Sequence, residues 1–232
     1  MPYQAIRVLS FDLDDTLWPV APMIAGAELE LRRWLEQHAP ATAAAFDALR
    51  MRSLRADIER EQPTLAHDLS ALRLLTLRRA IEIAGEPAHL AQQAFDVFFA
   101  ARQRVEFYPD VMPALQRLAQ RYRLVSLSNG NADLHHVGLG HLFCGSVSAR
   151  EVGCAKPDRR IFDAVCDRLG CEPSQVLHIG DHFEMDIAGA RAAGLMAIWL
   201  RRHVDGSAPP ADADDPAGCI ADLDELVQRL GC

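Results

Sequence analysis

The sequence VLSFDLDDTLW runs from Val8 to Trp18 and changes character halfway along. Its apolar first part is typical of a buried parallel strand, and Asp12, Asp14 and Asp15 then follow within four positions. Carboxylates are rarely buried unless they are paired or bind a metal ion. The stretch therefore predicts a core strand whose carboxyl end carries a functional site.

Residues 22–104 differ in composition, being rich in Ala, Leu, Arg and Glu and poor in β-branched residues. Four stretches space their apolar residues by three and four, as amphipathic helices do: 27–38, 43–60, 67–85 and 87–105. Prolines and a Gly-Glu-Pro sequence separate these stretches. The segment is predicted to be a bundle of about four helices.

After residue 106, short apolar runs alternate with amphipathic stretches. Strands are predicted at 123–129, 145–149, 175–181 and 195–200, helices at 110–122, 131–139, 158–170, 184–194 and 222–230, and a proline-rich loop at 204–219. This alternation predicts an α/β fold, with a parallel sheet and helices on both faces. We expect a core domain of residues 1–17 plus 106–232, and residues 18–105 as an inserted, all-helical domain.

The composition favours a folded enzyme-sized protein over other classes. The chain has 232 residues, of which 50% are hydrophobic and 24% charged, as in globular proteins. A formal charge of -8 argues against nucleic-acid or anionic-membrane partners, which require basic surfaces. No signal peptide or membrane-length apolar run is recognisable, and the six cysteines form no CxxC pair. We expect a soluble, cytoplasmic protein with reduced thiols, and the negative charge does not exclude an anionic small-molecule substrate.

Further polar residues follow the other predicted strands. Ser128, Asn129 and Gly130 end one strand, Asp181 ends another, and Lys156 lies in a loop before a helix. In open parallel sheets, ligands bind outside the carboxyl ends of the strands. We therefore expect these side chains to converge with the aspartates after the first strand on one edge of the sheet.

This set of groups suits phosphoryl transfer by way of an aspartyl-phosphate. Of Asp12 and Asp14, one would serve as nucleophile and metal ligand, and the other as acid and base. Asp181 would complete an all-oxygen site suited to Mg²⁺, and Lys156 would attract an anionic substrate. Ser128 and the backbone N–H groups that follow it, near the predicted helix at 131–139, would hold phosphate oxygens.

The stretches FDLDDTLW, SLSNG, KPD and GDHFEMD occur in this order and resemble the four motifs of the haloacid dehalogenase superfamily. The resemblance covers the whole chain. It implies a Rossmann-like core with an inserted four-helix cap of the C1 type, and an Mg²⁺-dependent hydrolase of phosphate monoesters. The resemblance implies that Asp12 is the nucleophile and that Asp14 is the acid/base group, which also offers its backbone carbonyl to Mg²⁺. It implies that Ser128 binds the phosphoryl group and that Lys156 steadies the nucleophile and the substrate. It further implies that Asp181 is a metal ligand and that Asp186 is an acidic partner of the site.

Six other residues are weaker candidates. Glu184 would lie within reach of the metal, Asp15 is expected to be a structural hydrogen-bonding group in the turn, and Trp18 would pack at a hinge or line the pocket. The cap residues His67, Arg52 and Arg55 are candidates for substrate contact.

Several functions stay open at this stage. The alternatives are a phosphomutase, a metal-independent 2-haloacid dehalogenase, and a non-catalytic binding protein of the same fold. Dehalogenases of the superfamily lack an acid two residues after the nucleophile, so Asp14 favours the phosphatase. The resemblance extends to the branch with flavin mononucleotide phosphatases and pyrimidine nucleotidases, which makes the expected substrate a nucleoside monophosphate, flavin mononucleotide or sugar phosphate. The oligomeric state is left undetermined.

Overall fold

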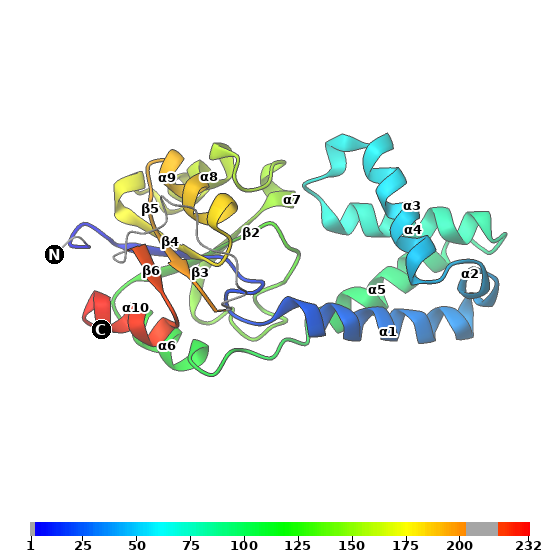
Figure 1. Ribbon diagram of the computed structural model, residues 1–232, viewed down its shortest axis with the longest axis horizontal. Helices are drawn as coiled ribbons and strands as arrows, with labels where there is room; N and C mark the ends of the chain where they lie inside the picture. Colours follow the sequence, from blue (N-terminus) through cyan, green and yellow to red (C-terminus); the bar gives the residue numbers. More distant parts are fainter. Residues whose placement is uncertain (1–2, 203–217) are drawn as a thin grey trace. The chain divides into compact units, whose positions relative to one another are not determined.

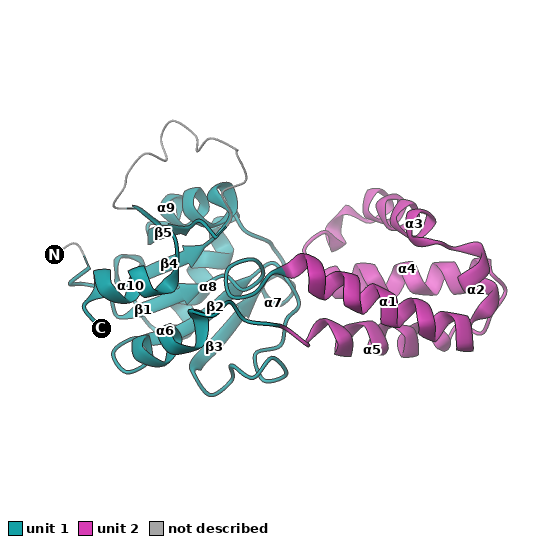
Figure 2. Ribbon diagram, turned by 60° about the horizontal axis from the view of Figure 1, so that its bottom comes forward, with its two compact units in different colours: residues 1–19, 106–232 teal, residues 20–105 magenta. Residues whose placement is uncertain are grey.

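The computed structural model of the protein describes residues 3–202 and 218–232. Nearly all of the segment predicted as a proline-rich loop, 204–219, lies outside the described residues. By its internal contacts the chain divides into two compact units, one of residues 1–19 and 106–232 and the other of residues 20–105 (Figure 2). The division falls two residues after the boundary expected between 17 and 18.

The first unit is built on a six-stranded sheet in the order β3-β2-β1-β4-β5-β6, and every neighbouring pair is parallel. The strands are β1 (Val8–Phe11), β2 (Arg123–Ser128), β3 (Phe143–Ser148), β4 (Val176–Gly180), β5 (Met196–Leu200) and β6 (Cys219–Ile220). All four residues of β1 are buried because the strand has neighbours on both edges and helices on both faces. The predicted α/β class is confirmed.

Helices α8 (Arg159–Leu169) and α9 (Gly189–Ala192) lie on one side of the sheet, and α6 (Val111–Leu118) and α10 (Leu223–Leu230) lie on the other (Figure 1). Short helices also occur at α7 (Ala149–Val152), η2 (Pro173–Gln175) and η3 (Phe183–Ala188). Polar side chains begin both α8 and α10, where Asp158 and Asp222 accept hydrogen bonds from backbone N–H groups of the first turn.

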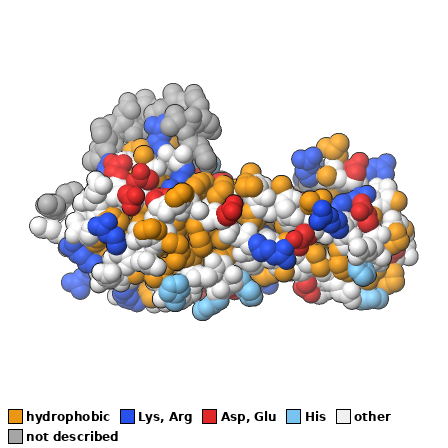
Figure 3. All heavy atoms as spheres, turned by 90° about the horizontal axis from the view of Figure 1, so that it is seen from below, with side chains coloured by type: hydrophobic (Ala, Val, Ile, Leu, Met, Phe, Trp, Pro, Cys, Tyr) orange, Lys and Arg blue, Asp and Glu red, His pale blue; other side chains and the backbone are white. Residues whose placement is uncertain are grey.

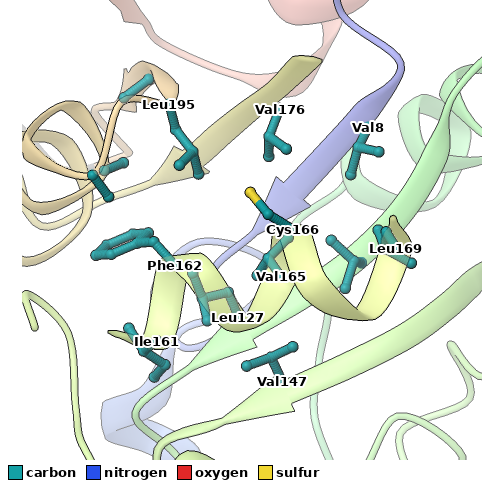
Figure 4. Close-up of a cluster of buried hydrophobic side chains, with 14 of the residues drawn as sticks. Val8, Leu127, Val147, Ile161, Phe162, Val165, Cys166, Leu169, Val176 and Leu195 are labelled. Atoms are coloured by element: carbon teal, nitrogen blue, oxygen red, sulfur yellow. The ribbon is translucent and has the colours of Figure 1, made fainter. Parts of the chain in front are cut away.

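One face of α8 is buried against the sheet (Figure 4). Its apolar side chains are spaced by three and four residues and pack with side chains from β1, β2, β3 and β4: Ile161, Phe162, Val165, Cys166 and Leu169 against Val8, Leu127, Val147 and Val176. Burial of each large apolar side chain contributes about 1.5–3 kcal/mol. This packing holds together the three central strands whose ends carry the candidate site.

The second unit is helical throughout its main elements: α1 (Val20–His38), α2 (Pro40–Ala45), α3 (Ala48–Glu61), η1 (Pro63–Leu65), α4 (Leu69–Ile83) and α5 (Leu90–Arg102). The stretch predicted as one helix at 43–60 is divided because the Asp47 carboxylate accepts the Arg50 N–H, 2.8 Å away, and starts α3. The first helix begins at Val20, seven residues before the predicted start at Ala27.

The helix predicted at 131–139 is wrong, since the structure has turns there. The Asp133 carboxylate accepts the N–H groups of His135 and His136, at 2.9 and 3.0 Å, and Gly138 has a φ of 87°. An aspartate that binds its own following backbone favours a turn over a helix. A helix N-terminus is therefore not available after Ser128 to bind phosphate.

None of the described helices is long and apolar enough to cross a membrane. On the face shown in Figure 3, positive and negative side chains are interspersed with apolar ones.

Candidate active site

The order of the strands brings three chain segments to one edge of the sheet. Strand β1 lies between β2 and β4, so that Asp12, Ser128 and Asp181 lie at the carboxyl ends of three adjacent parallel strands. The Asp12 N–H donates to the carbonyl of Ile179 at 2.9 Å, which extends the β1–β4 pairing to the aspartate. The site thus forms where strand order reverses, which is where ligands bind in doubly wound folds.

Lys156 lies between two carboxylates in the interior. Its Nζ is 2.5 Å from Oδ1 of Asp12 and 2.6 Å from Oδ1 of Asp186. Lys156, Asp12 and Asp186 are 4%, 7% and 1% exposed, so water screens these charges little. The exposures and distances make this group of three a charge-assisted network.

The loop that carries Lys156 is held by Asn129. The Lys156 N–H donates to Oδ1 of Asn129 at 2.7 Å, and Nδ2 of Asn129 donates to the Lys156 carbonyl at 3.1 Å. The side-chain amide of Asn129 thus contacts the lysine backbone, whereas the prediction for substrate concerned the backbone N–H groups that follow Ser128. This amide ties the end of β2 to the lysine loop, a role that the sequence did not indicate.

The charges in this network shift one another's pKa. Burial raises the pKa of Asp12, and the ammonium group of Lys156 offsets only part of that effect. Burial alone would also raise the pKa of Asp186, but Lys156 and a hydrogen bond from His178 outweigh it and hold the pKa below its ordinary value. Burial would lower the pKa of Lys156, yet the two carboxylates raise it, so this side chain stays charged.

His178 is a member of the network that the sequence analysis missed. Its Nε2 lies 3.1 Å from Oδ1 of Asp186, and its Nδ1 lies 3.0 Å from Oγ of Ser10. Burial lowers the pKa of His178, which favours the neutral ring. A neutral ring that donates from Nε2 to the carboxylate accepts the Ser10 hydroxyl at Nδ1. The sequence feature that could have identified it is the single histidine in the otherwise apolar strand Val176–Gly180.

Three carboxylates form a potential cation site. Among the described residues, one oxygen from each of Asp12, Asp181 and Asp186 lies within 4.8 Å of the others. Oxygen-only ligands suit Mg²⁺, and three carboxylates against the single ammonium of Lys156 leave an excess of negative charge for a cation. Burial and the charge of Asp186 raise the pKa of Asp181 to about 6. These groups therefore fit a divalent metal ion.

Asp186 takes part in this group, whereas the carboxylate of Asp14 does not. The resemblance assigned only the backbone carbonyl of Asp14 to the metal. Its side chain instead accepts a hydrogen bond from Nε1 of Trp18, with 2.8 Å between Nε1 and Oδ1. Asp15 has a φ of 59° and donates its N–H to the carbonyl of Trp18, as expected for a structural residue of the turn.

Gly180 permits the approach of Asp186 to the end of β4. A Cβ on Gly180 would lie 2.3 Å from Cγ of Asp186, a distance at which real Cβ atoms essentially never occur. The other oxygen of Asp186 accepts the His182 N–H at 3.0 Å, which fixes the carboxylate in this position. Glycine is thus required here by close contact with a site residue.

The remaining candidates are placed as follows. The buried Ser128 accepts the Gly130 N–H through Oγ at 2.9 Å, next to the lysine loop. Glu184 is exposed and lies outside the carboxylate group.

The cap candidates His67, Arg52 and Arg55 belong to the other compact unit. There Arg52 and Arg55 line a cavity of about 370 Å³.

The chain is similar to a known protein family and to several characterised proteins. A family model described as a haloacid dehalogenase-like hydrolase matches residues 6–194. The 5-amino-6-(5-phospho-D-ribitylamino)uracil phosphatase YigB of Escherichia coli is 30% identical over 204 residues, which cover 86% of this chain and 85% of that protein. The glyceraldehyde 3-phosphate phosphatase of Methanopyrus kandleri is 28% identical over 90% of each chain. A solved structure described as a 2-haloacid dehalogenase from Pseudomonas syringae has a TM-score of 0.90 and 38% identity, covering 97% of this chain and 98% of that one.

Proposed function

This chain belongs to the family of haloacid dehalogenase-like hydrolases, and on that premise we propose that it hydrolyses phosphate monoesters with the help of Mg²⁺. Residues 1–17 and 106–232 form the catalytic core in this proposal, and residues 18–105 form a cap of the C1 type. The substrate is a small phosphorylated metabolite of the cytoplasm, such as a nucleoside monophosphate, flavin mononucleotide or a sugar phosphate.

Asp12 is the nucleophile in this proposal. Its carboxylate attacks phosphorus, the bond to the leaving oxygen breaks, and an aspartyl-phosphate forms. Lys156, 2.5 Å from Asp12, orients the carboxylate and balances negative charge as the anionic substrate approaches. The network of Asp186 and His178 holds Lys156 in place.

Asp14 moves the protons. It donates a proton to the departing alkoxide, and then takes one from the water that hydrolyses the aspartyl-phosphate. Asp12, Asp181 and the backbone carbonyl of Asp14 would hold Mg²⁺, with Asp186 at the same carboxylate group. Bound there, the metal ion would act as a Lewis acid on the phosphoryl oxygens.

The observation that supports this function is the second carboxylate, Asp14, two residues after Asp12. Two relatives named as phosphatases support the same reaction. The 38% identical structure described as a 2-haloacid dehalogenase makes that reaction the second candidate. In a dehalogenation, Asp12 would displace a halide ion, which departs without a proton, and the acid function of Asp14 would have no use.

One experiment separates the two candidates. Release of phosphate from a panel of phosphorylated metabolites and release of chloride from L-2-chloropropionate are measured for the wild type, with Asp12→Asn as the control for contaminating enzymes. The proposal expects phosphate release that Asp12→Asn lowers by at least about 10³-fold. Chloride release without phosphate release would overturn it, and so would the absence of both activities.

A further inference from the structure

The indole Nε1 of Trp18 donates a hydrogen bond to Oδ1 of the Asp14 carboxylate, at 2.8 Å. We propose that Trp18 is a positioning residue that holds the carboxyl group of Asp14 in one orientation for the proposed reaction. The inference rests on the proposed function, because it concerns the acid and base role of Asp14. It gives Trp18 a part in the reaction beyond the hinge packing or pocket lining expected from the sequence.

The contact is fixed at both of its ends. Trp18 is fully buried, at 0% exposure, and its ring packs edge-on against Phe107 with 5.8 Å between centroids. Its backbone carbonyl accepts the Asp15 N–H at 2.8 Å, and the backbones of Asp14 and Trp18 form an isolated β-bridge. The left-handed conformation of Asp15, with φ of 59°, closes this turn. The indole N–H therefore has a defined direction relative to Asp14.

The chemistry of the indole makes the contact selective. An indole N–H can only donate a hydrogen bond and never accepts one. It donates to Oδ1 of Asp14, 2.8 Å away, and the carbonyl oxygen of a neutral carboxyl group is a better acceptor than its hydroxyl oxygen, so the contact favours Oδ1 as the carbonyl oxygen. The acidic proton of the neutral carboxyl is then on Oδ2.

The proposed proton transfers follow from this assignment. When the phosphorus–oxygen bond of the substrate breaks, the proton passes from Oδ2 of Asp14 to the leaving oxygen. In the second half-reaction, a proton from the attacking water returns to Oδ2 while its oxygen bonds to phosphorus. Trp18 exchanges no proton and holds the carboxyl in the orientation that both transfers need.

Removal of the N–H tests this role. We would measure kcat/KM of Trp18→Phe with phenyl phosphate and with 4-nitrophenyl phosphate, because kcat/KM covers the steps up to departure of the phenol. Phenol is a weaker acid than 4-nitrophenol, so its departure depends more on protonation of the leaving oxygen. The proposal expects the variant to lose about tenfold more activity with phenyl phosphate than with 4-nitrophenyl phosphate, which is a part of the 10²–10⁴-fold that general acid catalysis supplies. Trp34→Phe, in the other compact unit, is the matched control and should change neither value.

A second pair of variants separates positioning from packing. In an Asp14→Asn background, Trp18→Phe should not further change the ratio of the kcat/KM values for the two substrates, because the two residues act as one unit. Should Trp18→Phe fail to fold, β-(3-benzothienyl)alanine at position 18 keeps the ring shape and removes the N–H.

The outcomes distinguish this inference from the proposed function. Equal losses with both substrates, or a full additional loss in the Asp14→Asn background, would show that Trp18 is only a packing residue. A wild-type protein that hydrolyses neither substrate nor any other phosphate monoester would overturn the proposed function, and the inference with it.

Discussion

Lys156 and Asp186 form a buried ion pair, with 2.6 Å between Nζ and Oδ1 and side-chain exposures of 2% each. Lys156 is also the single lysine of the chain, whose other cationic side chains are arginines and histidines. Its ammonium group is shared with Asp12 at 2.5 Å. The pair therefore connects a residue of η3 with the carboxylate after β1, and it has consequences that can be measured.

Loss of the ammonium group should destabilise the fold. Lys156→Met leaves two buried carboxylates without their partner, and removal of one member of a buried ion pair costs about 3–5 kcal/mol. Urea denaturation would measure the free energy of unfolding. Arg159→Met is the control, since its pair with Asp163 is exposed and such pairs contribute about 0–1 kcal/mol. Equal losses in the two variants would contradict the assigned network.

The single lysine allows its charge to be followed directly. In protein labelled with ¹³Cε-lysine, NMR should show one lysine signal, and this signal should not titrate up to about pH 10.4, the ordinary lysine value. The pKa of Lys156 is raised in the folded state, so its stabilising contribution is fully present below the unfolded pKa and is lost only as the pH passes the folded one. A signal that titrates below pH 10 would refute the buried pairing.

Gly180→Ala should disturb the site more than an ordinary glycine substitution in the same sheet. The new Cβ would lie 2.3 Å from Cγ of Asp186 and push that carboxylate away from Lys156. We expect turnover to fall by about 10²-fold, as for a displacement of about 1 Å at a catalytic group. Gly145→Ala in β3 is the matched control, because its Cβ would have an ordinary nearest contact of 3.5 Å. Comparable turnover in the two variants would rule out this effect.

In metal-free protein, the contribution of Asp181 to the free energy of unfolding should be less favourable at pH 7 than at pH 4. Its pKa rises from 3.8 to about 6 on folding, so the folded state binds the proton more tightly, and stability falls as the pH rises through this range. In EDTA, Asp181→Asn should therefore exceed the wild type in unfolding free energy by about 1–2 kcal/mol at pH 7, and by less at pH 4.

The control for this prediction is Asp158→Asn. Arg160 lowers the pKa of Asp158 to about 2, so this carboxylate contributes stability above pH 3.8 that is lost as the pH falls through the folded value. Its replacement should not stabilise the protein at pH 7. Identical pH profiles for the two variants would show that burial of Asp181 has no effect.

Removal of divalent metal ions should abolish phosphate release, and Mg²⁺ should restore it. The potential ligands of Asp12, Asp181 and Asp186 are all oxygens, which Mg²⁺ prefers. Ca²⁺ should inhibit, because its larger and more flexible coordination shell suits the reaction geometry less well. Phosphate release after dialysis against EDTA, measured with each metal in turn, provides the check. Full activity in EDTA would favour the metal-independent dehalogenase.

The sequence by itself determined the strands and the acidic residues at their ends. The runs that became β1, β2, β4 and β5 are mostly apolar because parallel strands covered on both faces bury the side chains of both faces. The carboxyl ends of such strands meet at one edge of the sheet, so the sequence predicted that Asp12 and Asp181 lie at the same edge. The roles of these residues stay predictions until the variants are assayed.

The helix boundaries were predicted less well. Amphipathic periodicity reports which side of a helix is buried, but it does not report where a polar side chain ends the helix. Asp47 divides the stretch 43–60 and Asp133 replaces the helix at 131–139 with turns, in both cases by binding nearby backbone N–H groups. Such local side-chain bonds compete with helical ones and leave the apolar pattern unchanged.

Only the tertiary structure decided the partners of the site residues. Asp12 and Lys156 are 144 residues apart in sequence, and Ser10 and His178 are 168 apart, so no local pattern relates them. The same holds for the side-chain amide of Asn129, which binds the backbone of the lysine loop. Hydrogen bonds depend on distances below about 3.2 Å and on direction. Composition and periodicity determine which residues are buried, but the packing of β1, β2 and β4 determines which buried groups meet.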